Sequence, residues 1–235
     1  MLNEIIRHSV NFIRLSVALI NPASDYVGWG KRDKSSARKY FNSRQQQSNF
    51  FLWNQLSIED GKKICEIGSN AGSRIFDLAA QHPLLEFCGI DMNSDAISFA
   101  NHQARKMDLK NLEFVTLDIR NSQFREFLRE HEFACIFSWA TLIYVHPWNI
   151  KRVLEAMLQN ADEFVIVEQI ELKKRFSIVY YMGHLKWKHN YSQLIVDISE
   201  KQKMQVSIEV QEVPKDVWDP GGGDAKLLKV VKRNL

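Results

Sequence analysis

The stretch EIGSNAG, residues 66–72, decides the fold of this chain because it follows a short apolar run and opens a helix-compatible segment. Gly68 permits a sharp turn and a close approach to a ligand, and Gly72 permits close packing of the following helix. The N-terminus of that helix offers free N–H groups to a polar ligand. Glu66, at the end of the apolar run, can accept hydrogen bonds from a ligand or from the loop. Alone the pattern is a weak signal, since any tight strand-to-helix turn can use two glycines.

Short apolar runs alternate with amphipathic stretches from residue 62 onward, which is typical of βα units around a parallel sheet. Runs such as residues 164–167 are apolar on successive positions, as expected for strands covered by helices on both faces. The predicted strands are 63–67, 85–90, 112–117, 133–137 and 164–168, and the predicted helices are 71–81, 94–106, 122–130 and 148–159.

The end of the chain breaks this alternation. Residues 206–213 and 227–231 read as two strands, and the segment between them contains Pro214, Pro220 and three glycines. That composition indicates turns rather than a crossover helix. The last two strands are therefore predicted to pair as an antiparallel hairpin.

The first 60 residues are predicted to form a helical extension and lid, with the main domain spanning residues 61–235. Apolar residues recur at helical spacing between residues 2 and 20, and Arg14 interrupts them, so we predict a retained helix rather than a signal peptide. This helix either packs on the domain or contacts a membrane surface or a partner. Residues 35–56 carry five aromatic side chains on a helical pattern, and these either join the core or contact a cofactor.

Composition limits the function classes. The 235 residues fit one α/β domain, with no predicted integral membrane segment, and the net charge of +3 is too small to argue a nucleic-acid partner. Cys65, Cys88 and Cys135 lie in apolar runs without CxxC spacing, which argues against disulfides and zinc. That usage points to a reducing, cytoplasmic location, and no metal site is expected.

Polar residues follow successive predicted strands. Asp91 follows the second strand, where an acid can bind both hydroxyls of a ribose. Asp118 follows the third strand and can accept from an adenine amino group, and Ser138 follows the fourth. Because the carboxyl ends of parallel strands meet at one edge, these side chains are expected to share one crevice.

These motifs resemble the class I S-adenosylmethionine-dependent methyltransferases from the first strand to the C-terminus. The resemblance implies a Rossmann-like, mostly parallel seven-stranded sheet with an antiparallel C-terminal hairpin, and S-adenosylmethionine as the cofactor. It implies a methionine-side loop, a ribose-binding acid and an adenine contact at Glu66, Gly68, Ser69, Asn70, Gly72, Asp91, Met92, Asp118, Ile119 and Ser138. Asn70 departs from the family, in which many members have glycine, but asparagine tolerates left-handed backbone angles.

Residues 141–147 are similar to the loop after the fourth strand of small-molecule methylases, including those of surface-sugar biosynthesis. Tyr144 stands where many of those enzymes have histidine. We interpret Tyr144 and His146 as candidates for orienting or deprotonating a small-molecule acceptor. The structural alternative is that His146 caps the helix begun by Pro147 and that Tyr144 packs in the core.

Other functions remain open at this level. A nicotinamide-dependent oxidoreductase is disfavoured because a GxGxxG motif beginning at Gly68 would need glycine at Asn70 and Ser73. A non-catalytic, cofactor-binding scaffold subunit is compatible with the same fold. A nucleic-acid or protein-amide acceptor is disfavoured because the loop typical of planar-amine methylation is absent after the fourth strand. The basic, aromatic residues 180–189 are interpreted as a substrate lid rather than a base-stacking surface.

Overall fold

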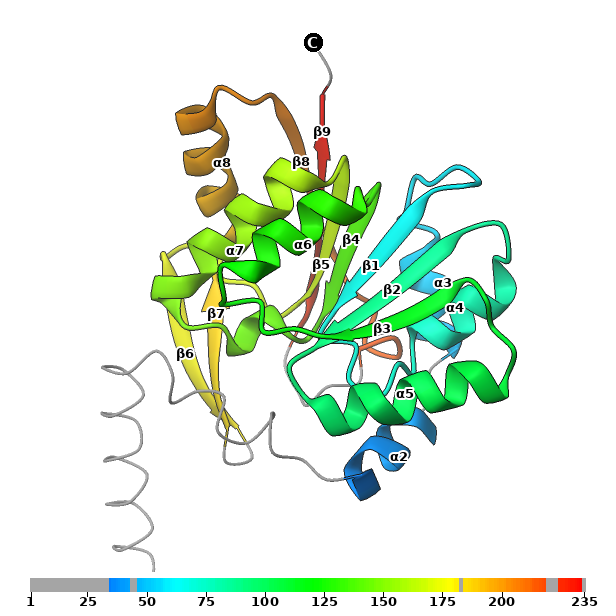
Figure 1. Ribbon diagram of the computed structural model, residues 1–235. Helices are drawn as coiled ribbons and strands as arrows, with labels where there is room; N and C mark the ends of the chain where they lie inside the picture. The colour runs from blue at the N-terminus through cyan, green and yellow to red at the C-terminus, as the bar shows by residue number, and fades with distance from the viewer. Residues whose placement is uncertain (1–33, 43–45, 182–183, 219–223, 234–235) are drawn as a thin grey trace, which may run out of the picture.

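The computed structural model describes residues 34–42, 46–181, 184–218 and 224–233, and its centre is a seven-stranded sheet (Figure 1). The strand order is β3-β2-β1-β4-β5-β9-β8, in which β9 pairs antiparallel with both β5 and β8 and the other pairs are parallel. The strands are β1 (Lys63–Ile67), β2 (Glu86–Asp91), β3 (Leu112–Thr116), β4 (Cys135–Trp139), β5 (Glu163–Glu168), β8 (Val206–Glu212) and β9 (Lys226–Lys232). The predicted mostly parallel sheet and its C-terminal antiparallel hairpin are confirmed.

Helices cover both faces of the sheet. One face carries α6 (Gln123–His131), α7 (Pro147–Asn160) and α8 (Tyr191–Gln202), and the other carries α3 (Gln46–Trp53), α4 (Ile75–Gln81) and α5 (Ser94–Lys106). Successive strand residues alternate between the two cores, as Ile64 and Cys65 of β1 do. This alternation explains why the strands are apolar on consecutive positions.

Several predicted boundaries shift. The helix after the glycine loop begins at Ile75 rather than residue 71, because Gly72 has a φ of +81° and extends the turn. Strand β4 reaches Trp139, so Ser138 lies inside the strand rather than after it. The predicted lid helix of residues 35–56 is two helices, α2 (Lys34–Asn42) and α3.

The aromatic residues of these two helices contribute to packing. Phe41 makes edge contacts with Phe76 and Phe99, at centroid distances of 5.1 and 5.7 Å. Leu52 of α3 is fully buried in the same core as Ile64. Phe41 therefore packs in the core, which is one of the two roles predicted for these aromatic side chains.

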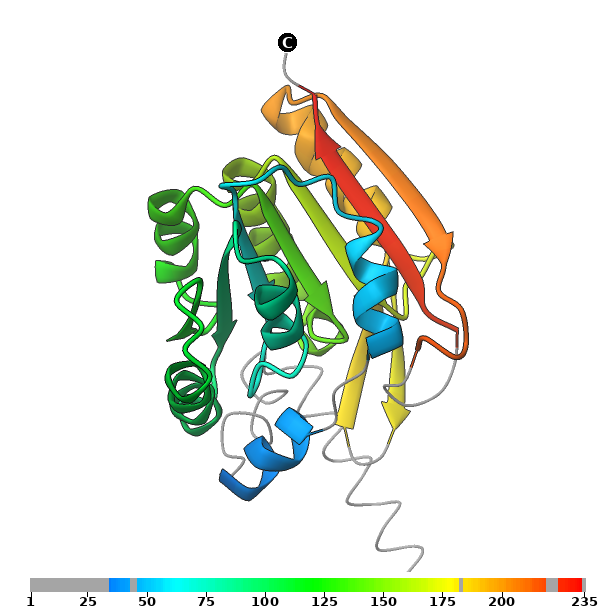
Figure 2. The same ribbon diagram turned by 90° about the vertical axis from the view of Figure 1, so that its right-hand side faces the viewer.

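An insertion after β5 forms a separate hairpin of β6 (Phe176–Tyr181) and β7 (His184–His189), and α8 follows it. Figure 2 shows this hairpin and α2 beyond the sheet edge at which the parallel strands end. Trp187 of β7 is 1% exposed and packs against His146, at a centroid distance of 4.8 Å. The hairpin is therefore anchored beside the connection that follows β4.

The predicted N-terminal helix lies outside the described residues. Arg38 and Lys39 are exposed on α2. The three cysteines are free and buried. Within the described ranges, no helix has both the length and the apolar character needed to cross a bilayer.

Candidate cofactor and acceptor site

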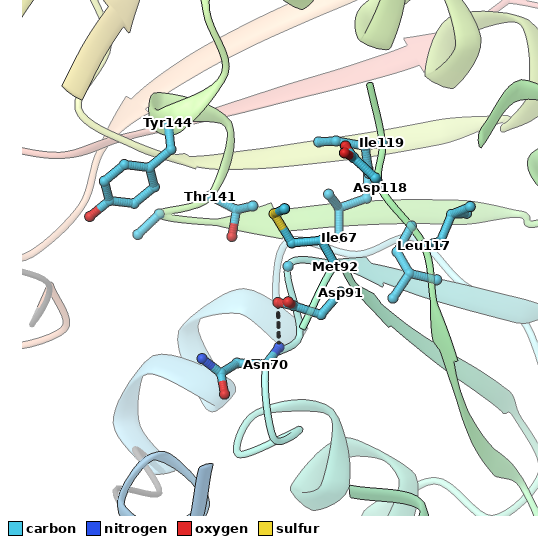
Figure 3. A pocket seen from close by; sticks show the side chains of 12 residues that line it. Ile67, Asn70, Asp91, Met92, Leu117, Asp118, Ile119, Thr141 and Tyr144 are labelled. Atoms are coloured by element: carbon cyan, nitrogen blue, oxygen red, sulfur yellow. Dashed lines mark hydrogen bonds between the residues drawn. The ribbon is translucent and has the colours of Figure 1, made fainter. Parts of the chain in front are cut away.

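An open cavity of about 580 Å³ lies at the carboxyl ends of β1 to β4 (Figure 3). Its position is the one at which open α/β sheets bind ligands. The lining residues come from the ends of four strands and the connections that follow them, namely Ile67, Gly68, Asn70, Ile90, Asp91, Met92, Leu117, Asp118, Ile119, Ala140, Thr141 and Tyr144. The structure therefore brings together seven of the predicted site residues, Gly68, Asn70, Asp91, Met92, Asp118, Ile119 and Tyr144.

Asp91 is held rigidly at the cavity wall. Its Oδ2 accepts the backbone N–H of Asn70 at 3.0 Å, and its Oδ1 accepts the backbone N–H of Asn93 at 2.8 Å. Asn93 in turn caps the N-terminus of α5 through its side-chain oxygen. Burial raises the pKa of Asp91, and the bonds from Asn93 and Asn70 oppose that rise. Each carboxylate oxygen retains acceptor capacity, which suits a ligand with paired hydroxyls.

The glycine loop packs closely against the connection after β4. Gly68 has a φ of +76°, and a Cβ there would lie 2.1 Å from Thr141 Oγ1. No side chain fits between these two segments, so glycine is required for both conformation and space. Asn70 adopts a φ of +49°, which confirms the left-handed conformation predicted for it.

Asp118 is oriented by its own loop. Arg120 Nε donates to Asp118 Oδ1 at 2.9 Å, and Arg120 Nη2 donates to Oδ2 at 2.7 Å. This two-point contact fixes the plane of the carboxylate beside Leu117 and Ile119. The arrangement leaves lone pairs for an amino group while the apolar neighbours suit a flat aromatic ring.

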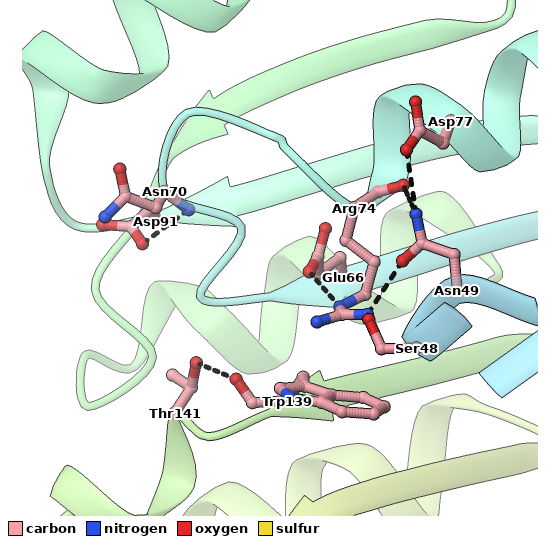
Figure 4. Close-up of polar contacts among 9 residues, drawn as sticks. All are labelled: Ser48, Asn49, Glu66, Asn70, Arg74, Asp77, Asp91, Trp139 and Thr141. Atoms are coloured by element: carbon pink, nitrogen blue, oxygen red, sulfur yellow. Dashed lines mark hydrogen bonds and ion pairs between the residues drawn. The ribbon is translucent and has the colours of Figure 1, made fainter. Parts of the chain in front are cut away.

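Behind the glycine loop lies a buried polar cluster centred on Arg74 (Figure 4). Its Nη1 donates to Ser48 Oγ at 2.9 Å and to Asn49 Oδ1 at 2.8 Å, which connects α3 to the start of α4. Its Nε lies 3.9 Å from Glu66 Oε1, and its guanidinium stacks 4.0 Å from the ring centroid of Trp139.

Burial shifts both charged groups of this cluster. It raises the pKa of Glu66 to about 7 against the opposing charge of Arg74. It also lowers the pKa of Arg74 to about 10, while Glu66 opposes the change. Glu66 is 4% exposed and does not line the cavity. Sequence reasoning missed Arg74, although a cation two residues after Gly72 was an available signal.

Three other predicted site residues are also buried outside the cavity wall. Ser69, Gly72 and Ser138 do not line the cavity. Among the described residues, the hydroxyls of Ser69 and Ser138 and the Oε2 of Glu66 have no hydrogen-bond partner. Ser138 is in register with Ile67, so these oxygens lie around the end of β1.

The two residues predicted to contact the methyl acceptor, Tyr144 and His146, lie in different surroundings. Tyr144 ends the short 3₁₀ helix η2 (Leu142–Tyr144) and lines the cavity. His146 is 2% exposed, and its Nδ1 accepts the backbone N–H of Trp148 at 3.3 Å, which caps α7. Its ring packs against Trp187 rather than lining the cavity. The geometry therefore supports the capping interpretation of His146 and not the core-packing interpretation of Tyr144.

Comparison with known proteins agrees with this geometry. A sequence model of a family described as a methyltransferase domain matches residues 58–218. The chain belongs to the class I S-adenosylmethionine-dependent methyltransferases. The residues matched include all four strands whose ends line the cavity.

The chain's relatives are distant. A tRNA (guanine-N(7)-)-methyltransferase of Pediococcus pentosaceus is 25% identical over 121 residues, covering 52% of this chain and 54% of that protein. The chain thus spans about half the length of the curated relatives it matches. An S-adenosylmethionine-dependent methyltransferase from Aquifex aeolicus superposes with a TM-score of 0.58 at 17% identity, covering 85% and 98% of the two chains. The plantazolicin methyltransferase BpumL, solved with S-adenosylhomocysteine, gives 0.59 at 17% identity over 98% and 100%.

The cavity suits the family's cofactor. Asp91, Asp118 and the glycine loop supply its polar groups, and sequence reasoning missed five other lining residues. These are the polar Thr141 and the apolar Ile67, Ile90, Leu117 and Ala140, and the four apolar residues are indistinguishable from core positions in the sequence. Within the described part of the chain, no three His, Cys, Asp or Glu side chains are grouped as metal ligands.

Proposed function

We propose that this protein transfers a methyl group from S-adenosylmethionine to a small-molecule acceptor. The observation that carries the proposal is that Asp91 and Tyr144 line the same cavity. A rigid acid suited to a ribose and a phenol suited to an acceptor thus share one space. Methyl transfer from a sulfonium is an in-line displacement whose rate depends mainly on how the two reactants are positioned.

The cofactor side of the proposal assigns roles residue by residue. Asp91 would accept from the ribose hydroxyls, and Asp118 would accept from the adenine amino group between Leu117 and Ile119. When bound, the cofactor supplies an electrophilic methyl group. The apolar part of the cavity wall would limit its contact with water.

Tyr144 is the acceptor-side residue in this proposal. Its hydroxyl can donate to or accept from an acceptor oxygen or nitrogen. His146 holds the end of the same connection by capping α7, and so acts on the acceptor through Tyr144 rather than by direct contact. The β6–β7 hairpin, seated on this connection, would close over the acceptor.

Two other functions are compatible with this fold. The relatives named as tRNA methyltransferases support a nucleic-acid acceptor, but the chain lacks a strong positive charge, and Ser138-Trp139-Ala140-Thr141 replaces the planar-amine loop. A non-catalytic scaffold would bind cofactor without turnover. The free, buried cysteines support a reducing compartment such as the cytoplasm.

The test supplies S-adenosylmethionine carrying a labelled methyl group to the protein together with either the small-molecule fraction or the tRNA fraction of a bacterial extract. We expect label in small molecules only, and its loss in Tyr144→Phe and Asp91→Ala variants. Label in tRNA would replace the proposed acceptor class. Tight cofactor binding without label in either fraction would favour the scaffold.

A further inference from the structure

Glu168, at the carboxyl end of β5, is fully buried and is not used by the function proposed above. Its Oε2 accepts the backbone N–H of Ile143 at 3.0 Å, and its Oε1 accepts the hydroxyl of Tyr191 from α8. The backbone N–H groups of Leu142 and Thr141 also favour the charged form of this carboxyl group. One carboxyl group therefore connects η2 to α8.

The segment that Glu168 holds, residues 141–144, is part of the cavity wall. It follows Ala140, whose φ of +54° is rare for a residue with a Cβ and turns the chain sharply out of β4. Thr141 rests against Gly68 on one side of the segment, and Tyr144 reaches the cavity on the other. Movement of this segment would displace both residues together.

The β6–β7 hairpin holds the residues that follow. His189 Nε2 lies 2.8 Å from the carbonyl oxygen of Val145, and Trp187 packs on His146. Burial lowers the pKa of His189 to about 4, so the ring is neutral near pH 7 and donates to Val145. Glu168 thus fixes the start of the connection after β4, and β7 fixes its end.

We propose that Glu168 is a positioning residue for the acceptor side, whose carboxylate orders residues 141–144 and thereby places Tyr144 in the cavity. The mechanism is capping, because carboxyl oxygens accept N–H donors that lack partners at the start of a helix, and they accept most strongly above the pKa of Glu168, where the group is charged. The effect on methyl transfer rests on the proposed function. The ordering of the segment does not.

The charge of Glu168 depends on the groups around it. Burial raises its pKa to about 8, and the bonds from Tyr191, Ile143, Leu142 and Thr141 oppose that rise. From β7 the ammonium of Lys186 favours the charged form. Lys226 of β9 is in register with Glu168, but its ammonium bonds to Glu212. Loss of the carboxylate charge weakens its N–H bonds, so the order of residues 141–144 should follow its titration.

The test uses the isotope-labelled full chain saturated with S-adenosylhomocysteine. The amide resonance of Ile143 is followed from about pH 6 to about pH 10, and hydrogen exchange of residues 141–144 is measured alongside. We expect one titration step near the pKa of Glu168 in the unmodified protein. Glu168→Gln should remove the step and speed amide exchange in this segment by about tenfold or more.

Two further variants sharpen the test. Tyr191→Phe removes a bond that lowers the pKa of Glu168, so the step should move to higher pH. Glu163→Gln is the matched control, because Glu163 begins the same strand, is also buried, and bonds instead to Lys229 and Ser57. This control should leave the Ile143 titration unchanged. A titration that persists in Glu168→Gln, or unchanged exchange in residues 141–144, would overturn the proposal.

Activity is measured separately. At a pH above the pKa of Glu168, where the unmodified protein carries the charged carboxylate, Glu168→Gln should lower labelled methyl transfer by about 10- to 100-fold, with affinity for S-adenosylhomocysteine within about threefold. Failure of the unmodified protein to bind S-adenosylhomocysteine would refute the proposed function. The role of Glu168 in ordering residues 141–144 would then be tested by the same Ile143 titration on the protein without ligand. If the Ile143 amide titrates as expected in the unmodified protein but Glu168→Gln transfers methyl groups at the unmodified rate, the positioning role is refuted.

Discussion

Replacing Asp91 with alanine should weaken S-adenosylhomocysteine binding by about 1.5–3 kcal/mol, which is about 10- to 150-fold in the dissociation constant. The magnitude is that of hydrogen bonds to a charged acceptor, which the carboxylate would make with the ribose hydroxyls. The variant also releases the backbone N–H groups of Asn70 and Asn93, which bond to Asp91 at 3.0 and 2.8 Å. The loop is therefore expected to loosen as well as to lose the ligand contact.

Calorimetric titration at neutral pH measures the change, and two further variants separate its causes. Asp91→Asn keeps the shape and one acceptor oxygen, but its amide group faces a backbone donor, so an intermediate loss is expected. Asp95→Ala is the control, because Asp95 is exposed in the first turn of α5 and does not line the cavity. Unchanged affinity in Asp91→Ala would remove Asp91 from the site and refute the reasoning.

Three further predictions concern the scaffold of the site. Gly68→Ala should lower the unfolding free energy by about 1–3 kcal/mol and weaken cofactor binding, because the added Cβ would meet Thr141. Gly61 has a similar φ of +77° but lies in open space, so Gly61→Ala should cost less and leave cofactor binding intact. His146→Ala should lower the unfolding free energy measured by chemical denaturation by about 0.5–2 kcal/mol, because the cap of α7 is lost, and should leave cofactor affinity unchanged. His146→Asn should recover part of this stability. A large loss of turnover without a loss of stability would instead make His146 catalytic. The pKa of Glu168 is raised in the folded chain, so it holds a proton that the unfolded chain has lost between about pH 4.5 and about pH 8. Its contribution should lower stability by about 1.4 kcal/mol per pH unit as pH rises through that window, and Glu168→Gln should flatten the curve of unfolding free energy against pH.

Much of the sheet was predictable because its signals are local. Residues 164–167 are apolar on successive positions and became a central strand buried on both faces. The turn-rich segment beginning at Pro214 separated two strands that do pair as an antiparallel hairpin. Strand β4 was placed about two residues early, because the apolar run from Phe133 does not show where pairing with β1 begins.

The sequence did not predict the strands and the helix of the insertion after β5. Residues 180–189 were interpreted as a lid from their aromatic and basic composition, but the hairpin and α8 were not predicted. Trp187 and Lys186 are both buried although they are adjacent in β7, so the strand lacks the alternation that identifies a half-exposed strand. Their burial comes from contact with His146 and from the neighbourhood of Glu168, which are distant in the chain.

The order of the residues was enough to establish the βα alternation, the glycine turn at 68–72 and the acids that follow the second and third strands. These features depend on backbone preference and periodicity within a few residues. The membership of the cavity was not available in that way. Thr141 faces Gly68, and Glu168 bonds to Ile143, across 73 and 25 positions of the chain. Contacts of this kind are set by strand order and helix packing, so the folded chain alone places Tyr144 in the cavity and His146 outside its wall.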